Sequence, residues 1–214
     1  MEGNEMINNN YSPAYILDWD DSHLLDIDYD AFIVKFSGWE NTIRLSLTRE
    51  YDLPNTIKFD AIFDTLKNTD FPVTNVRWPI FSNQIWEILK ELQSFPHKEI
   101  PVVMVDCQVV SDGQGSTKVS GTENDNFIAV QLLEHLDLLD WENSIVEPSF
   151  ILPDQIMGVQ KLVLKETTYP LPPLFRLSAY PTALLASSQA RMALEEAGIK
   201  GVVFEEIENY DLTI

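Results

Sequence analysis

The stretch from Leu174 to Phe204 constrains the fold of this chain more than any other part of the sequence. It reads as a strand, a helix, a glycine stop and a second strand. Ser187 is a suitable N-cap, and Gly198 supplies the left-handed residue that commonly ends a helix. The apolar positions between them repeat with helical spacing at Ala190, Ala193, Leu194 and Ala197. These small side chains predict a helix that packs closely on a sheet.

A second helix is predicted between a Ser82 cap and Pro96. Its apolar positions lie three or four residues apart, at Ile85, Ile88, Leu89 and Leu92. The following run, Ile100–Val110, is continuously apolar and rich in β-branched residues, as in a strand buried on both faces. Cys107 is expected to lie on this strand.

Shorter signals predict further strands. Phe32–Phe36 and Ile43–Leu47 alternate apolar and polar residues around a turn, which is typical of a hairpin. Ile156–Leu164 is expected to be a strand between proline-rich connections. Phe127–Leu139 fits both a strand and a helix, and Ser111–Asn126 has the composition of a mobile loop. Together these elements predict an α+β fold, with a mixed, mainly antiparallel sheet flanked by a few helices.

The chain length indicates one domain. With 214 residues, of which 45% are hydrophobic, the chain can bury a substantial core. Residues 1–10 are polar and are expected to form a disordered tail. Residues 11–214 are expected to form a single domain, built as one unit or as two packed halves, 11–96 and 97–214, that meet near Pro96.

The charge of the chain is strongly negative. Fourteen basic residues stand against 34 acidic ones, a formal net charge of −20. Such a surface disfavours nucleic-acid binding, which needs a positive footprint, and favours a basic partner, although acidity also serves solubility. No Lys or Arg precedes Lys35. The candidate partner-binding residues are those of the acidic segment (residues 18–30): Asp18, Trp19, Asp20, Asp21, Asp26, Asp28 and Asp30.

Trp19 stands between two aspartates, and an exposed aromatic ring surrounded by charge is a common binding hot spot. The alternative for Trp19 is packing in the core. Trp39 is likewise not assigned to the core. The remaining aromatic residues of note are interpreted as core: Trp78, Phe81, Trp86, Trp141 and Phe175.

The acidic segment also has the spacing of a calcium loop at Asp26, Asp28 and Asp30. Ala31 occupies the position that needs glycine, and Ser37 the position that needs a bidentate Glu. A solvated acidic face is therefore the preferred interpretation. The three histidines are far apart in the sequence, and we expect no metal site and no cofactor.

Cys107 is the single cysteine, so the chain cannot form an internal disulfide, which fits a reducing compartment. With no apolar run long enough to cross a bilayer, we expect a cytoplasmic protein without a membrane partner. A hydrolase would need Cys107 activated by a distant histidine, His97 or His135. A cysteine in a valine-rich run is more typical of a core position.

Three phrases occur in a fixed order along the chain: RWPIFS at Arg77–Ser82, LDWENS at Leu139–Ser144, and the C-terminal stretch described above. Between Arg77 and Phe204 the chain resembles bacterial immunity-protein family eleven of polymorphic toxin systems. The matching residues are Arg77, Trp78, Pro79, Leu139, Asp140, Ser144, Ala197, Gly198, Gly201 and Phe204.

The resemblance implies a non-enzymatic antitoxin that stays in the producing cell and neutralises a cognate effector toxin, delivered by contact-dependent secretion such as type VI secretion. The acidic composition favours a basic, nuclease-type toxin as the partner. The matching phrases themselves are expected to be structural. A Cys107-dependent hydrolase and a calcium-dependent binding module are the alternatives.

Overall fold

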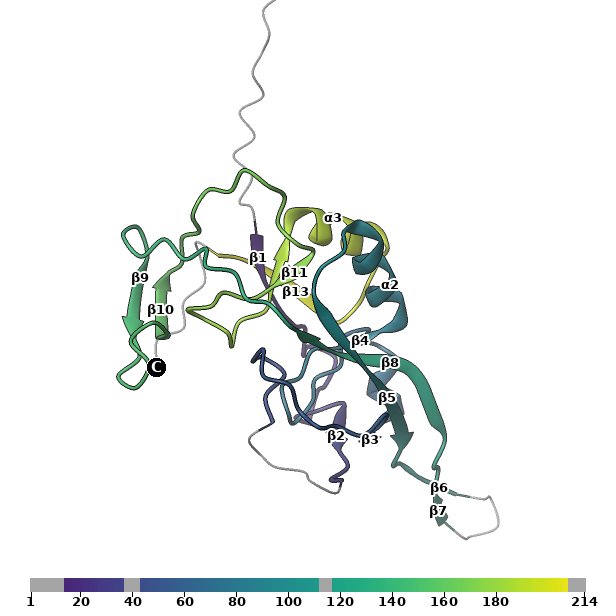
Figure 1. Ribbon diagram of the computed structural model, residues 1–214. Coiled ribbons are helices and arrows are strands. Elements are labelled where there is room, and N and C mark those ends of the chain that lie inside the picture. The colour runs from purple at the N-terminus through teal and green to yellow at the C-terminus, as the bar shows by residue number, and fades with distance from the viewer. Residues whose placement is uncertain (1–13, 37–42, 112–116, 208–214) are drawn as a thin grey trace, which may run out of the picture.

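The computed structural model describes residues 14–36, 43–111 and 117–207. The fold is α+β, as predicted, with mostly antiparallel sheets and a few helices (Figure 1). The described strands form a four-stranded sheet, a five-stranded sheet and two small two-stranded ribbons. Within these residues, no helix is both long enough and apolar enough to cross a membrane.

The four-stranded sheet joins the beginning and the end of the described chain. Its order is β11-β12-β1-β13, and all its neighbours are antiparallel. Ile16 of β1 lies opposite both Leu185 and Glu205. The strands are β1 (Ala14–Trp19), β11 (Leu174–Phe175), β12 (Leu185–Ser187) and β13 (Val202–Glu206).

The five-stranded sheet has the order β2-β3-β5-β8-β4, in which β3 and β5 run parallel. Its strands are β2 (Ala31–Ile33), β3 (Ile57–Ala61), β4 (Ile80–Ser82), β5 (His97–Asp106) and β8 (Glu123–Leu132). The two ribbons pair β6 (Val109–Ser111) with β7 (Thr117–Val119), and β9 (Ile145–Pro148) with β10 (Ile156–Lys161). A short helix, α1 (Phe63–Leu66), follows β3.

Both predicted long helices are confirmed, and each begins directly after a short strand. In α2 (Asn83–Leu92) the Ser82 hydroxyl accepts a hydrogen bond from the Ile85 amide at 3.3 Å. In α3 (Ser188–Glu196) the Ser187 hydroxyl accepts from the Ala190 amide at 3.2 Å. Each cap satisfies one of the amide groups that a helix N-terminus leaves without an intrahelical partner.

The two helices share one apolar cluster that joins the two larger sheets. Trp86 and Leu89 of α2 pack with Ala190 and Leu194 of α3. The same cluster contains Leu17 from the four-stranded sheet, together with further residues of both sheets: Phe81, Ile128, Val130 and Ala186. The helices therefore fix how the sheets lie against each other.

Strands from both sides of Pro96 contribute to each of the two larger sheets. β3 pairs with β5 across that position, and β1 pairs with β12 and β13 at the far end of the chain. The chain therefore does not divide into separate sheets at Pro96. Residues 1–10, the expected tail, lie outside the described residues.

The predicted hairpin of Phe32–Phe36 with Ile43–Leu47 is wrong. β2 ends at Ile33 and pairs with β3, while residues 43–47 form no strand. Ile43 and Leu45 are nevertheless buried in the apolar cluster beneath the five-stranded sheet. Their alternation reflects alternate burial without strand pairing. Residues 37–42, which include Trp39, lie outside the described part.

Three further expectations need correction. Part of Ser111–Asn126 is ordered as β7 and the start of β8, although residues 112–116 are not described. Cys107 lies just beyond β5, because that strand ends at Asp106. Trp141 is 41% exposed rather than buried, whereas Trp78, Phe81, Trp86 and Phe175 are core residues as predicted.

The ambiguous and proline-bounded stretches resolve into strands. Phe127–Leu132 belongs to β8, and beyond it Leu136 and Leu139 make only isolated bridges, to Leu177 and Leu164. The predicted strand at Ile156–Leu164 is present as β10, which ends earlier, at Lys161. The stretch Phe127–Leu139 fitted both a strand and a helix pattern because it contains the end of a strand followed by an irregular connection.

Several positions in the three phrases singled out in the sequence, RWPIFS, LDWENS and the C-terminal stretch, have structural roles. Trp78 and Leu139 are buried, and the Ser144 hydroxyl lies within hydrogen-bonding distance of both the amide and the carbonyl of Val163. Gly198 and Gly201 both adopt positive φ angles, 66° and 76°. Arg77 differs from these, because it is exposed and lines a pocket.

Candidate functional site

The acidic segment leaves the end of β1 and folds into consecutive turns. The Leu24 amide donates to the Asp21 carbonyl at 2.9 Å, and the Ile27 amide donates to the Leu24 carbonyl at 3.1 Å. The Asp20 carboxylate accepts from the Ser22 amide at 3.1 Å, and hydrogen bonding to Ser22 lowers the pKa of Asp20. These turns hold several of the carboxylates toward solvent.

The structure separates the seven predicted partner-binding residues into three groups. Asp18, Asp21, Asp26 and Asp28 are exposed, and Asp20 is partly exposed. Trp19 is half-buried and packs on Phe71, with ring centroids 5.8 Å apart. The position of Trp19 agrees with the packing alternative, because its ring lies against the apolar cluster of the helices, and its contact with a partner stays a prediction.

Asp30 does not belong to the exposed face. Its side chain is 0% exposed and accepts a hydrogen bond from the Val73 amide at 2.9 Å. The His23 imidazole lies 2.9 Å from its other oxygen. Asp30 thus anchors the acidic segment to the neighbouring chain, a role that its regular spacing with Asp26 and Asp28 did not indicate.

Leu25 is a residue that the sequence analysis missed. It is 90% exposed and has a φ angle of 54°, in the left-handed region that a leucine rarely adopts. Its neighbours in the chain include the exposed carboxylates of Asp21, Asp26 and Asp28. The exposed apolar group in the acidic segment is therefore Leu25 rather than Trp19.

A groove of about 700 Å³ runs beside the acidic segment. Asp21 and Asp28 line it together, so the structure brings these two carboxylates to one surface. Basic side chains line the same groove, from Lys35, Arg44 and Arg77. The groove is therefore mixed in charge, and the carboxylates of the segment form one side of it.

The calcium interpretation of Asp26, Asp28 and Asp30 finds no support in their positions. Asp26 and Asp28 are exposed, whereas Asp30 is buried against Val73 and His23. Within the described ranges, no three His, Cys, Asp or Glu residues form a group that could hold a metal ion.

Cys107 and His97 do not form a catalytic pair. His97 is the first residue of β5 and Cys107 follows the last, so a strand of about 30 Å separates them. Burial, together with the nearby carboxylates of Asp60 and Asp106, raises the pKa of the Cys107 thiol. Because the thiolate is the nucleophile, this environment makes the sulfur less reactive.

His135 is held in its neutral form. Burial, and secondarily the positive charge of Arg176, lowers its pKa from 6.5 to about 4. Arg176 itself is buried and lines a pocket between the two larger sheets. The sequence analysis missed Arg176, although a single cation within the apolar phrase LFRLSAY was the available signal.

In comparisons with known proteins, no protein-family model and no curated protein matches this sequence.

Proposed function

We propose that this chain is an immunity protein, which binds and neutralises a cognate secreted toxin in the bacterium that produces both. The exposed face of the acidic segment is the docking surface, and a basic nuclease is the toxin class that suits it best. The face consists of Asp18, Asp20, Asp21, Leu25, Asp26 and Asp28.

The observation that carries this proposal is the set of exposed carboxylates around an exposed leucine. Asp21, Asp26 and Asp28 surround Leu25 in the sequence, and no Lys or Arg precedes Lys35. An exposed leucine with charged neighbours offers a partner an apolar contact inside a polar rim, which is the usual anatomy of a protein interface. The three phrases that resemble an immunity-protein family add support for the class of protein.

The charge of the face favours a nuclease over other toxins. A nuclease cleft must be positive to hold a nucleic-acid backbone. An acidic inhibitor approaches such a cleft along a favourable field, which raises the association rate and selects among partners. The net charge of −20 makes this protein suited to that encounter.

The experiment that tests the proposal is capture of the partner followed by a toxicity assay. The tagged chain is expressed in its native host, and stoichiometric partners are identified by mass spectrometry. We expect one partner that arrests growth when expressed alone and is harmless when this protein is co-expressed. Partners that are not toxic, or whose toxicity persists, would contradict the proposal.

A Cys107→Ala variant distinguishes an inhibitor from the Cys-dependent alternative. An immunity protein keeps protecting cells after this change, because Cys107 does not belong to the acidic face and an inhibitor needs no thiol chemistry. A hydrolase would lose turnover. Protection that vanishes although the variant remains folded would count against the immunity role.

A further inference from the structure

A second cavity, of about 320 Å³, lies between β1, the segment that precedes β4, and the loop between β11 and β12. Its walls are part apolar and aromatic, with Phe71, Tyr180 and Leu184 among them, and part polar. Two arginines also line it, Arg77 and Arg176. We call this cavity the arginine pocket. Its volume is at the lower end of the range for small-molecule sites, which begins at about 300 Å³.

Arg176 is a buried cation. It is 3% exposed, and its Nη1 donates to the carbonyls of Pro181 at 2.8 Å and Thr182 at 3.0 Å. Its Nε is buried and has no hydrogen-bond partner in the described part of the chain. Burial lowers the pKa of Arg176 to about 10, which still leaves the guanidinium charged at neutral pH.

No carboxylate compensates this charge within the described chain. The ion pairs among residues 14–36, 43–111 and 117–207 do not include Arg176. A buried charge without a partner is costly, so arginine is rarely buried unless it is paired. Acidic residues greatly outnumber basic ones in this chain, with a net charge of −20. From composition alone, a buried arginine would therefore be expected to have a carboxylate partner.

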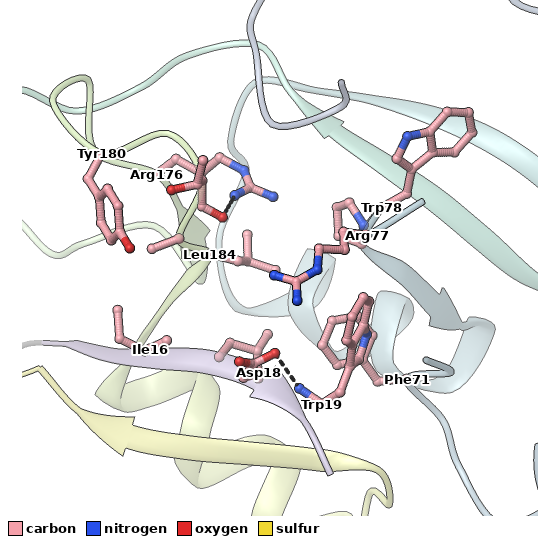
Figure 2. A pocket seen from close by; sticks show the side chains of 13 residues that line it. Ile16, Asp18, Trp19, Phe71, Arg77, Trp78, Arg176, Tyr180 and Leu184 are labelled. Atoms are coloured by element: carbon pink, nitrogen blue, oxygen red, sulfur yellow. Dashed lines mark hydrogen bonds between the residues drawn. The ribbon is translucent and has the colours of Figure 1, made fainter. Parts of the chain in front are cut away.

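Arg77 brings a second guanidinium to the same space. Figure 2 shows the Arg77 and Arg176 side chains extending into the pocket, with Asp18 on its other side. Arg77 has a φ angle of 51°, a left-handed conformation that costs energy for a residue with a Cβ. Strain of this kind is common at ligand-binding sites.

Trp19 and Asp18 contribute further polar groups to the lining of the pocket. The indole Nε1 of Trp19 is buried and meets no acceptor in the described residues. The Asp18 carboxylate accepts from the Trp19 amide at 2.8 Å (Figure 2). The ion pairs among the described residues do not include Asp18. The charged lining of the cavity thus consists of the guanidinium groups of Arg77 and Arg176 and the carboxylate of Asp18.

We propose that the arginine pocket binds a small organic anion, a carboxylate or a phosphate monoester with an apolar body. The anionic oxygens accept from the guanidinium groups of Arg77 and Arg176, and the apolar body packs on the aromatic walls. Guanidinium groups suit both anions because their planar donors match two oxygens at once. The inference is independent of the toxin partner.

The test is a titration of the purified full chain with four probes, followed by calorimetry and tryptophan fluorescence. Benzoate and phenyl phosphate are the organic anions, benzamide is the neutral analogue, and inorganic phosphate lacks the apolar body. We expect saturable binding of benzoate, of phenyl phosphate or of both. Stronger binding of one of them distinguishes a carboxylate ligand from a phosphate ligand.

Variants locate the binding in the pocket. Arg77→Gln and Arg176→Gln are expected to weaken binding of the preferred probe at least tenfold. Lys161→Gln, an equal charge change at the exposed end of β10, should leave it unchanged. Arg77 is exposed and makes no side-chain hydrogen bond with the described residues, so Arg77→Gln should fold. If Arg176→Gln does not fold, Arg77→Gln alone tests whether the probes bind in the pocket.

Three results would overturn the proposal. The first is that neither organic anion binds. The second is that one of the two control probes binds as tightly as the organic anions. Equal binding of benzamide would mean that the charge of the ligand takes no part, and equal binding of inorganic phosphate would mean that the apolar walls take no part. The third is that Arg77→Gln binds the probes as tightly as the natural chain.

Discussion

His23 Nε2 lies 2.9 Å from Oδ1 of Asp30, a carboxylate with no exposed surface. The backbone of Asp30 is equally well fixed, because its amide donates to the Val73 carbonyl at 2.9 Å and its carbonyl accepts from the Ile62 amide at 2.8 Å. Asp30 therefore ties the acidic segment, β2 and the residues before β4 into one unit.

An Asp30→Ala substitution should destabilise the fold by about 3 kcal/mol, since it leaves the Val73 amide and His23 without their acceptor in a buried place. Urea unfolding followed by circular dichroism measures the loss. Asp26→Ala is the matched control, an exposed residue of the same segment, and should change stability by no more than about 0.5 kcal/mol. Equal effects of the two substitutions would show that Asp30 is not the anchor.

Reversing the exposed carboxylates should slow association with the toxin. A variant with Asp21, Asp26 and Asp28 changed to Lys is expected to associate about tenfold more slowly at low salt. The difference should largely vanish near 1 M salt, where the screening length is only about 3 Å. Stopped-flow kinetics with the captured toxin provides the measurement.

The control for that variant changes the same charge elsewhere. Glu142, Glu147 and Glu166 are exposed residues outside the acidic segment, and their triple change to Lys alters the net charge equally. If both triple variants slow association to the same degree, association depends on the net charge of the molecule and the acidic face has no special role.

Leu25 should matter for binding and not for folding. A Leu25→Asn change is expected to weaken the complex at least tenfold, about 1.4 kcal/mol, as at a hot spot. The fold should tolerate it, because asparagine accepts the left-handed conformation that Leu25 adopts. Calorimetry on the complex and thermal unfolding of the free protein separate the two effects. Ile151→Asn, at another highly exposed apolar residue, should leave affinity unchanged.

Two glycines with similar backbone angles should respond differently to alanine. At Gly198 an added Cβ meets nothing within 4 Å, so only the positive φ of 66° opposes the change, at about 1 kcal/mol. At Gly201 the Cβ would overlap the Thr69 hydroxyl. Gly201→Ala should therefore destabilise by about 1–3 kcal/mol more than Gly198→Ala. Denaturant midpoints compare the two, and equal losses would mean that Thr69 moves aside freely.

His135 should make the fold sensitive to mild acid. The folded protein keeps His135 neutral down to about pH 4, whereas the unfolded chain takes up this proton below about 6.5. Proton uptake then favours the unfolded state, so the free energy of unfolding falls as the pH decreases from 6.5 to 4. Denaturant unfolding should show a steeper loss over this range for the natural chain than for His135→Gln. Parallel pH profiles would contradict the assignment.

The elements that the sequence predicted correctly are those whose signals are local. Ser82 and Ser187 cap helices by bonding to amides three residues ahead, and Gly198 follows the end of α3 directly. The burial of Asp30 has no such signal. Its partners, His23 and Val73, come from positions that only the folded chain brings together.

The same limit applies to the candidate sites. Exposure of Asp21, Asp26 and Asp28 followed from their polarity, but the inward turn of Trp19 depends on contact with Phe71. Arg176 meets Arg77 across the pocket although the two are far apart in the sequence. At Ile43 and Leu45 the alternating pattern predicted buried positions correctly, because both side chains are buried. The same pattern predicted a paired strand wrongly.

The central position of β1 in the four-stranded sheet has a consequence for the newly made chain. β1 hydrogen-bonds to β12 on one side and β13 on the other, so neither edge is satisfied until the C-terminal strands leave the ribosome. Contacts so distant in sequence make folding slow, in the range of milliseconds to seconds, because a long loop must close first. Until then β1 offers two unpaired edges, which makes this segment a natural client for a chaperone during synthesis.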